Sequence, residues 1–123
     1  MMNFLDRRVV HPGSFVFKEG DSGDQAFIIQ TGAVELLRGE TVIAELSANT
    51  IFGEMALIDG APRMASARAR TETTLIVIPR AMVDAKLKGV DPFVIKLLGI
   101  LVQNVRSMAG KLGESKPDSP AAN

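Results

Sequence analysis

The chain has 123 residues, of which 46% are hydrophobic, so it suits one compact domain with its own core and is not compositionally disordered. Its 14 basic and 14 acidic residues cancel, so no positive field favours nucleic acid, and we expect no nucleic-acid partner. No cysteine and a single histidine, His11, leave no ligands for a zinc site, so we expect no metal and no resident cofactor. Without a signal peptide or a membrane-length apolar run, the sequence predicts a cytoplasmic protein with no membrane partner.

Residues 13–78 read as short strands separated by glycine-containing turns, a pattern typical of a small antiparallel roll or barrel. Gly32 and Gly39 lie between β-rich runs, where a residue with positive φ is usually needed, so both predict tight hairpins. The predicted strands are residues 14–18, 26–30, 33–38, 41–46, 65–70 and 74–78.

Residues 51–66 have the residue types of a site for a sugar and a phosphate. Gly53 lacks a Cβ, so a ligand can approach the backbone, and the residues after it suit a single helical turn whose first amides favour an anion. Glu54 offers two acceptor oxygens for vicinal hydroxyls, and Arg63 offers a planar fork of donors for phosphate. The predicted ligand-binding residues are Phe52, Gly53, Glu54, Met55, Ala56, Arg63, Met64, Ala65 and Ser66.

Two features of this region have a second interpretation. Ala65, Ala67 and Ala69 alternate along a strand, and such small residues either leave room for a ligand or fill a tapering barrel interior. Glu54 and Arg63 either bind a ligand together or form an internal salt bridge in a domain that has lost its ligand. The sequence leaves both alternatives open.

From Pro79 the pattern becomes helical. We predict a short helix over residues 80–88, and a second helix of roughly twenty residues with Asp91 as its N-cap. The apolar residues of the second helix repeat at three- and four-residue steps and extend beyond one stripe, so we expect it to bury more than one face. The polar, proline-containing tail, residues 114–123, is expected to be disordered, which leaves residues 1–113 as a single domain.

At these residues the chain resembles the cyclic nucleotide-binding domains of catabolite activators, cyclic-nucleotide-dependent kinases and gated channels. The resemblance includes residues 17–24 and 26–36, which look like that family's first hairpins, and the Phe-Gly-Glu and Pro-Arg elements of residues 52–54 and 62–63. It implies an eight-stranded antiparallel β-roll of the jelly-roll type with C-terminal helices. It also implies that Glu54 holds a ribose hydroxyl and that Arg63 holds the cyclic phosphate.

In that family a C-terminal helix closes over the base as a lid. The candidates here are Leu97, Leu98, Leu101, Val102 and Val105, although the same apolar stripe also suits core packing or a homodimer seam. The family usually has Ala, Ser or Thr after the arginine, and a hydroxyl there can assist recognition of cyclic GMP. Because Met64 has no hydroxyl, we expect a preference for cyclic AMP, with cyclic GMP as the other possible ligand.

The resemblance implies a stand-alone cyclic nucleotide receptor that signals through ligand-dependent movement of its C-terminal helices. No helix-turn-helix, kinase or channel is recognisable after residue 113, so the expected output is an unknown protein partner or a dimer. The alternative is a ligand-free β-roll that serves as an interaction domain. An enzyme is not expected, because neither a metal set nor a general base with an orienting partner can be assembled.

Overall fold

The computed structural model describes residues 6–109, which form eight strands and three helices. The strands lie in two four-stranded sheets, in the orders β1-β8-β3-β6 and β2-β7-β4-β5. Each paired set of strands is antiparallel, so the predicted β-roll is confirmed. The strands are β1 (Arg7–Val10), β2 (Phe15–Phe17), β3 (Gln25–Thr31), β4 (Val34–Arg38), β5 (Thr41–Leu46), β6 (Ile51–Phe52), β7 (Ser66–Ala69) and β8 (Thr73–Pro79).

Six of these strands match the sequence predictions within one or two residues, while β1 and β6 are additional. Strand β1 was missed because only Val10 of its four residues is buried, so it lacks an apolar alternation. Strand β6 has only two residues and pairs with β3 through Phe27 and Ile28. The predicted hairpin turns are present, with φ of 101° at Gly32 and 60° at Gly39.

The core lies between the two sheets and consists mainly of aliphatic and aromatic side chains. Ala67 and Ala69 of β7 belong to it and are essentially inaccessible to solvent. At these two positions the small side chains therefore fill the interior of the roll and do not leave room for a ligand. Ala65 is also buried, but it lies on the wall of a cavity described below.

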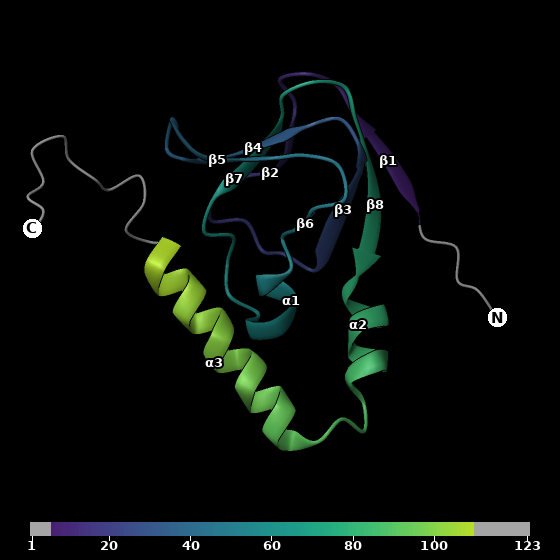
Figure 1. Cartoon of the computed structure of the whole chain (residues 1–123), viewed down its shortest axis with the longest axis vertical. Coiled ribbons are helices and arrows are strands. Elements are labelled where there is room, and N and C mark those ends of the chain that lie inside the picture. Colours follow the sequence, from purple (N-terminus) through teal and green to yellow (C-terminus); the bar gives the residue numbers. More distant parts are fainter. Residues whose placement is uncertain (1–5, 110–123) are drawn as a thin grey trace, which may run out of the picture.

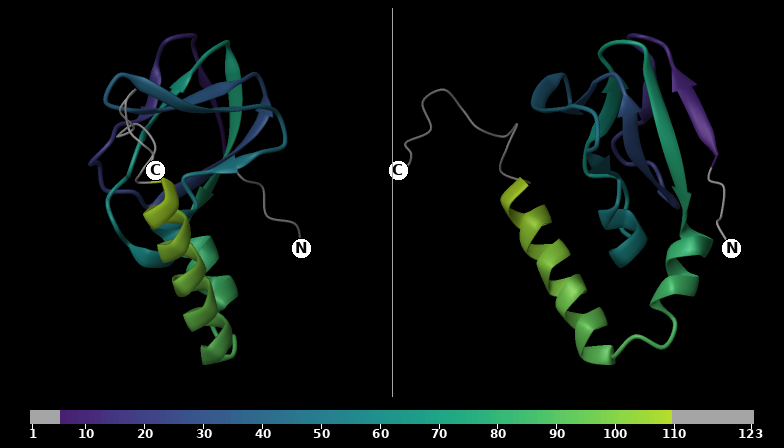
Figure 2. Two further views of the ribbon diagram at one scale, coloured as in Figure 1. Left: turned by 60° about the vertical axis from the view of Figure 1, so that its left-hand side comes forward. Right: turned by 45° about the vertical axis from the view of Figure 1, so that its right-hand side comes forward.

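The three helices lie at one end of the roll: α1 (Met55–Asp59), α2 (Arg80–Leu87) and α3 (Pro92–Ala109). Figures 1 and 2 show α1 between the other two helices, with α2 continuing from β8 on one side and α3 returning on the other. Asp91 caps α3 as predicted, because its carboxylate accepts a hydrogen bond of 2.8 Å from the amide of Phe93. None of these helices is long and apolar enough to cross a membrane.

The expectation that the last helix buries more than one face is wrong for the described residues. Helix α3 contains no buried residue, and several of its large apolar side chains are more than 40% exposed. Its half-buried residues, Leu98, Val102 and Arg106 among them, form one narrow stripe that faces α1. The predicted disordered tail, residues 114–123, and the last apolar repeat position, Leu112, lie outside the described residues.

Candidate functional site

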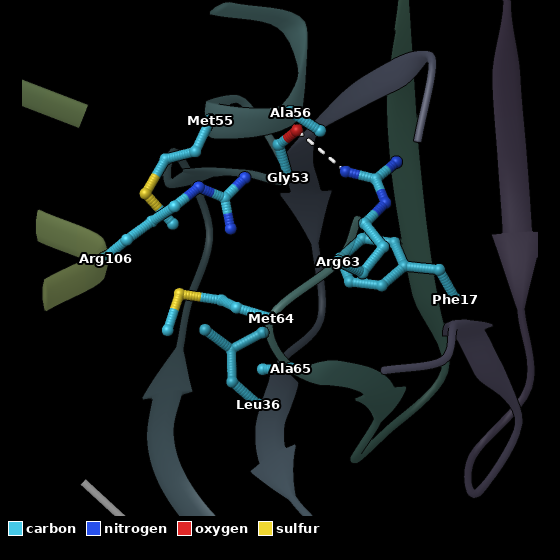
Figure 3. A pocket seen from close by; sticks show the side chains of 9 residues that line it. All are labelled: Phe17, Leu36, Gly53, Met55, Ala56, Arg63, Met64, Ala65 and Arg106. Atoms are coloured by element: carbon cyan, nitrogen blue, oxygen red, sulfur yellow. Dashed lines mark hydrogen bonds between the residues drawn. The ribbon is translucent and has the colours of Figure 1, made fainter. Parts of the chain in front are cut away.

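A cavity opens between the end of the roll and the helices, next to the segment that joins β6 to β7. It is lined by Phe17, Leu36, Gly53, Met55, Ala56, Arg63, Met64, Ala65 and Arg106. Figure 3 shows Arg63 and Phe17 on one side, and Met55, Met64 and Arg106 on the other. The volume is about 60 Å³, which is room for roughly four to six water molecules.

Arg63 is the buried cation of this cavity, with 7% of its surface exposed. Its Nη1 donates to the carbonyl of Gly53 at 2.8 Å and its Nη2 donates to the carbonyl of Gln25 at 2.6 Å. The guanidinium also lies 4.0 Å from the ring centroid of Phe17, a cation–π arrangement. Within the described residues its buried Nε has no hydrogen-bond partner, so one donor of the fork is left for an acceptor from outside.

Two glycines make the space for this guanidinium. A Cβ on Gly23 would lie 2.4 Å from the Cζ of Arg63, and one on Gly53 would lie 2.9 Å from its Nη1. Gly53 also has a φ of 78°, a left-handed conformation that side chains other than glycine rarely adopt. Burial lowers the pKa of Arg63, while the charges of Asp24 and Asp21 act in the opposite direction. Because the ordinary arginine pKa lies far above neutrality, the group stays a cation.

Glu54 precedes α1 and is half-buried. The internal Glu54–Arg63 salt bridge considered from the sequence does not form, because Arg63 donates to backbone carbonyls instead. In the part of the chain that the structure describes, the Glu54 carboxylate makes no hydrogen bond. It is therefore available to a ligand hydroxyl, and its predicted role stays a prediction.

Six of the nine predicted ligand-binding residues line the cavity, and Phe52, Glu54 and Ser66 do not. Phe52 is buried in the core, where its ring stacks on that of Phe27 with centroids 5.4 Å apart. The hydroxyl of Ser66 accepts a hydrogen bond from the amide of Glu19 at 2.9 Å, which fixes the loop before β3. These two residues support the walls of the site from behind.

Arg106 of α3 also lines the cavity, and the sequence analysis did not single it out. It forms a two-pronged ion pair with Asp59 at the end of α1, with Nε–Oδ2 at 2.5 Å and Nη2–Oδ1 at 3.1 Å. The side chains of Arg106 and Asp59 are only 14% and 19% exposed, although Asp59 as a whole residue is exposed. Burial alone raises the pKa of Asp59, but hydrogen bonds from Arg106 and from the amide of Ala61 outweigh this effect and lower it.

None of the five predicted lid residues lines the cavity in this structure. Leu98 and Val102 are half-buried, while Leu97, Leu101 and Val105 are 41%, 49% and 45% exposed. The contact of α3 with the cavity is instead made by a polar residue from the stripe that faces α1. A purely apolar periodicity search cannot find Arg106, because such a search assigns charged residues to solvent.

The residue types of the site suit a small anion that also carries hydroxyl groups. The cavity has a buried guanidinium whose Nε has no acceptor within the described residues, and the first amide groups of α1 are not used within that helix. Beside the cavity, the Glu54 carboxylate makes no hydrogen bond to any described residue. The described residues contain no group of three or more side chains that could hold a metal ion. A β-roll with these groups at one end has the features of a domain that binds a phosphate-containing ligand.

Comparison with known proteins supports this assignment. The model of the family described as "Cyclic nucleotide-binding domain" matches residues 7–89, more than half of the 123 residues, and the chain belongs to this family. It is 42% identical over 72 residues to a cyclic nucleotide-gated potassium channel of Rhizobium etli, covering 58% of this chain and 20% of the channel. It is also 29% identical over 110 residues to the cyclic AMP receptor protein of Thermus thermophilus, covering 85% of this chain and 51% of that protein.

Solved structures agree with this result. The cyclic AMP-bound form of the EAL enzyme Bd1971 superimposes with a TM-score of 0.75 at 32% identity, covering 86% of this chain and 30% of that chain. The chain spans about a fifth of the length of the first curated relatives, between 19% and 21%. The similarity therefore concerns one domain of those larger proteins.

Proposed function

We propose that the chain is a cyclic AMP receptor domain and not an enzyme, and that it signals by moving its C-terminal helices. The observation that carries this proposal is the buried Arg63, whose Nε has no acceptor within the described residues. A buried cation with an unused donor is costly unless an anion reaches it, and a cyclic phosphate supplies the acceptor. The matched family model and the cyclic AMP-bound form of Bd1971 support this choice of ligand.

Coupling to α3 follows from the position of Arg106. This side chain forms part of the cavity wall, so a nucleotide bound there lies against α3. A shift of Arg106 disturbs its ion pair with Asp59 and so changes how α3 rests on α1. Coupling of this kind needs a ligand that favours one position of α3 over the other, with a difference of about 1–3 kcal/mol.

The proposal includes a stand-alone output through the exposed face of α3. Val94, Leu101, Val105 and Met108 are 40%, 49%, 45% and 66% exposed, and their spacing of seven, four and three residues is typical of one face of a helix–helix seam. We infer that a second copy of the chain covers this face. Analytical ultracentrifugation with and without cyclic AMP tests the inference, and a monomer under both conditions would leave the face to a different protein partner. The cytoplasmic location stays a prediction.

Isothermal titration calorimetry with cyclic AMP and cyclic GMP tests the binding claim. We expect wild-type protein to bind cyclic AMP more tightly, and Arg63→Ala or Glu54→Ala to weaken binding at least ten-fold, since a hydrogen bond to a charged group contributes about 1.5–3 kcal/mol. Arg70→Ala is the matched control, because Arg70 pairs with Glu45 on the exposed sheet surface. If wild-type protein shows neither binding heat nor a thermal shift with either nucleotide, the ligand-free interaction domain becomes the better interpretation.

A further inference from the structure

Arg80 is the first residue of α2 and has no part in the cavity wall. Its backbone position is fixed, because strand β8 ends beside it in the pair Gln25↔Pro79 and its amide donates to the carbonyl of Asp24 at 2.9 Å. From this fixed point the side chain extends across to α1. Figure 1 shows α1 and α2 next to each other, so one arginine side chain can reach from the first residue of α2 to α1.

The guanidinium of Arg80 joins three segments by hydrogen bonds to backbone carbonyls. Its Nη2 donates to Ala56 at 2.9 Å and to Gly23 at 3.0 Å, and its Nη1 donates to Leu57 at 3.3 Å. Ala56 and Leu57 belong to α1, and the carbonyl of Ala56 also accepts a hydrogen bond of 2.9 Å from the amide of Gly60 at the C-cap of this helix. A cation at this end of a helix is electrostatically favourable.

The same two segments also meet at the phosphate-binding arginine. Gly23, whose carbonyl accepts from Arg80, is the residue whose missing Cβ makes room for the guanidinium of Arg63. Ala56, whose carbonyl also accepts from Arg80, lines the cavity. If α1 or the loop at Gly23 moves on ligand binding, the hydrogen bonds to Arg80 must stretch or Arg80 must move with them.

We propose that Arg80 is the positioning residue that transmits the position of α1 to α2, and through α2 to α3. This inference rests on the proposed function, because it assumes that a cyclic nucleotide moves α1. An apolar contact also joins the helices, where Leu57 packs near Met82 and Val83. Apolar contacts are non-directional and allow sliding, whereas the forked bonds of Arg80 hold α1 in one register with the start of α2.

The experiment measures a ligand-dependent distance in the whole chain. The sequence contains no cysteine, so Glu40→Cys in the β4–β5 turn and Asn104→Cys on the exposed side of α3 give a clean pair of sites for spin labels. Distances are recorded by double electron–electron resonance without nucleotide and with saturating cyclic AMP. Calorimetry on the same labelled samples gives the affinity independently. The variants are Arg80→Met, which keeps the side-chain length without donors, and Arg80→Lys, which keeps charge and donors without the fork.

We expect a cyclic AMP-dependent shift in the wild type, a smaller shift in Arg80→Lys and loss of the shift in Arg80→Met, with affinity within about ten-fold of the wild type. Arg70→Met is the matched control and should behave as the wild type. A full shift in Arg80→Met overturns the inference, as does a wild type that binds without any shift. If Arg80→Met does not fold, Arg80→Lys decides, and an undiminished shift there overturns the inference. Absence of binding in the wild type refutes the proposed function instead.

Discussion

The substitution Gly23→Ala tests the placement of Arg63 with the smallest possible change. The φ of Gly23 lies outside the positive range, so alanine is compatible with the backbone, but its Cβ would lie 2.4 Å from the Cζ and Nε of Arg63. The guanidinium must shift, and because it is only 7% exposed it cannot do so without losing a hydrogen bond to Gly53 or Gln25. One such bond contributes about 1.5–3 kcal/mol.

This loss predicts two measurable effects of Gly23→Ala. For a domain of this size each kcal/mol corresponds to about 4 °C, so Tm should fall by about 6–12 °C in a thermal melt. The Kd for cyclic AMP should rise by about ten-fold to a hundred-fold in calorimetry, because Arg63 no longer points at the phosphate position.

The control is the same substitution at Gly99 within α3, where a Cβ would meet nothing within 4 Å. Gly99→Ala should leave Kd unchanged and raise stability by about 0.5–1 kcal/mol, since alanine is the better helix former. If Gly23→Ala keeps both the Tm and the Kd of the wild type, the guanidinium does not occupy the position described and the argument for a preformed phosphate site fails.

Three further predictions concern the helices and the ligand preference. Asp91→Ala should destabilise the start of α3 by about 1 kcal/mol, seen as lower helicity on heating by circular dichroism, since it removes the cap to Phe93. Because the pKa of Asp59 is lowered from 3.8 in the folded state, its ion pair with Arg106 is fully present above about pH 4 and is lost as pH falls below that value, so amide exchange in α3 should accelerate there. Met64→Thr should raise the affinity for cyclic GMP relative to cyclic AMP in competition binding, because it supplies a hydroxyl at the cavity wall.

Each of these predictions has a clear contrary result. Unchanged melting of Asp91→Ala would mean that tertiary contacts, and not the cap, fix the start of α3. In Asp59→Asn the acceleration of amide exchange in α3 below about pH 4 should disappear. If it persists, it must come from another carboxylate. A Met64→Thr variant with the wild-type ratio of affinities would show that this side chain does not face the base.

The sequence predicts the roll and the cassette, which is the ligand-binding segment of residues 51–66, well because both depend on local rules. Six strands follow from apolar alternation between turn residues, and the glycine turns follow from their need for positive φ. The cassette segment is likewise continuous in the chain, so six of its nine predicted residues reach the cavity. Strand β6 could not be predicted from alternation, because two residues are too few to show a period.

The contribution of α3 could not be predicted, because it depends on which face of the helix turns toward α1. The apolar stripe and the family resemblance gave five lid candidates, of which Leu98 and Val102 face α1 and the other three are exposed. The structure instead turns the stripe with Arg106 inward, where the ion pair with Asp59 holds it. An ion pair between residues 47 positions apart leaves no local signal in the sequence. Much of the apolar face stays exposed, so apolar periodicity in this helix does not report core packing.

The segment from Gly53 to Arg63 is held by three guanidinium groups, one from its own last residue and one each from α2 and α3. Arg63 donates to the carbonyls of Gly53 and Gln25, Arg80 donates to carbonyls of α1, and Arg106 pairs with Asp59. A helix of five residues is not stable on its own, so these contacts and its packing set its position. Two of the Arg63 nitrogens already donate to backbone carbonyls, so an acceptor at its unpartnered Nε would act on a group that also holds Gly53 and Gln25. The proposed coupling therefore depends on side chains that join α1 to both α2 and α3.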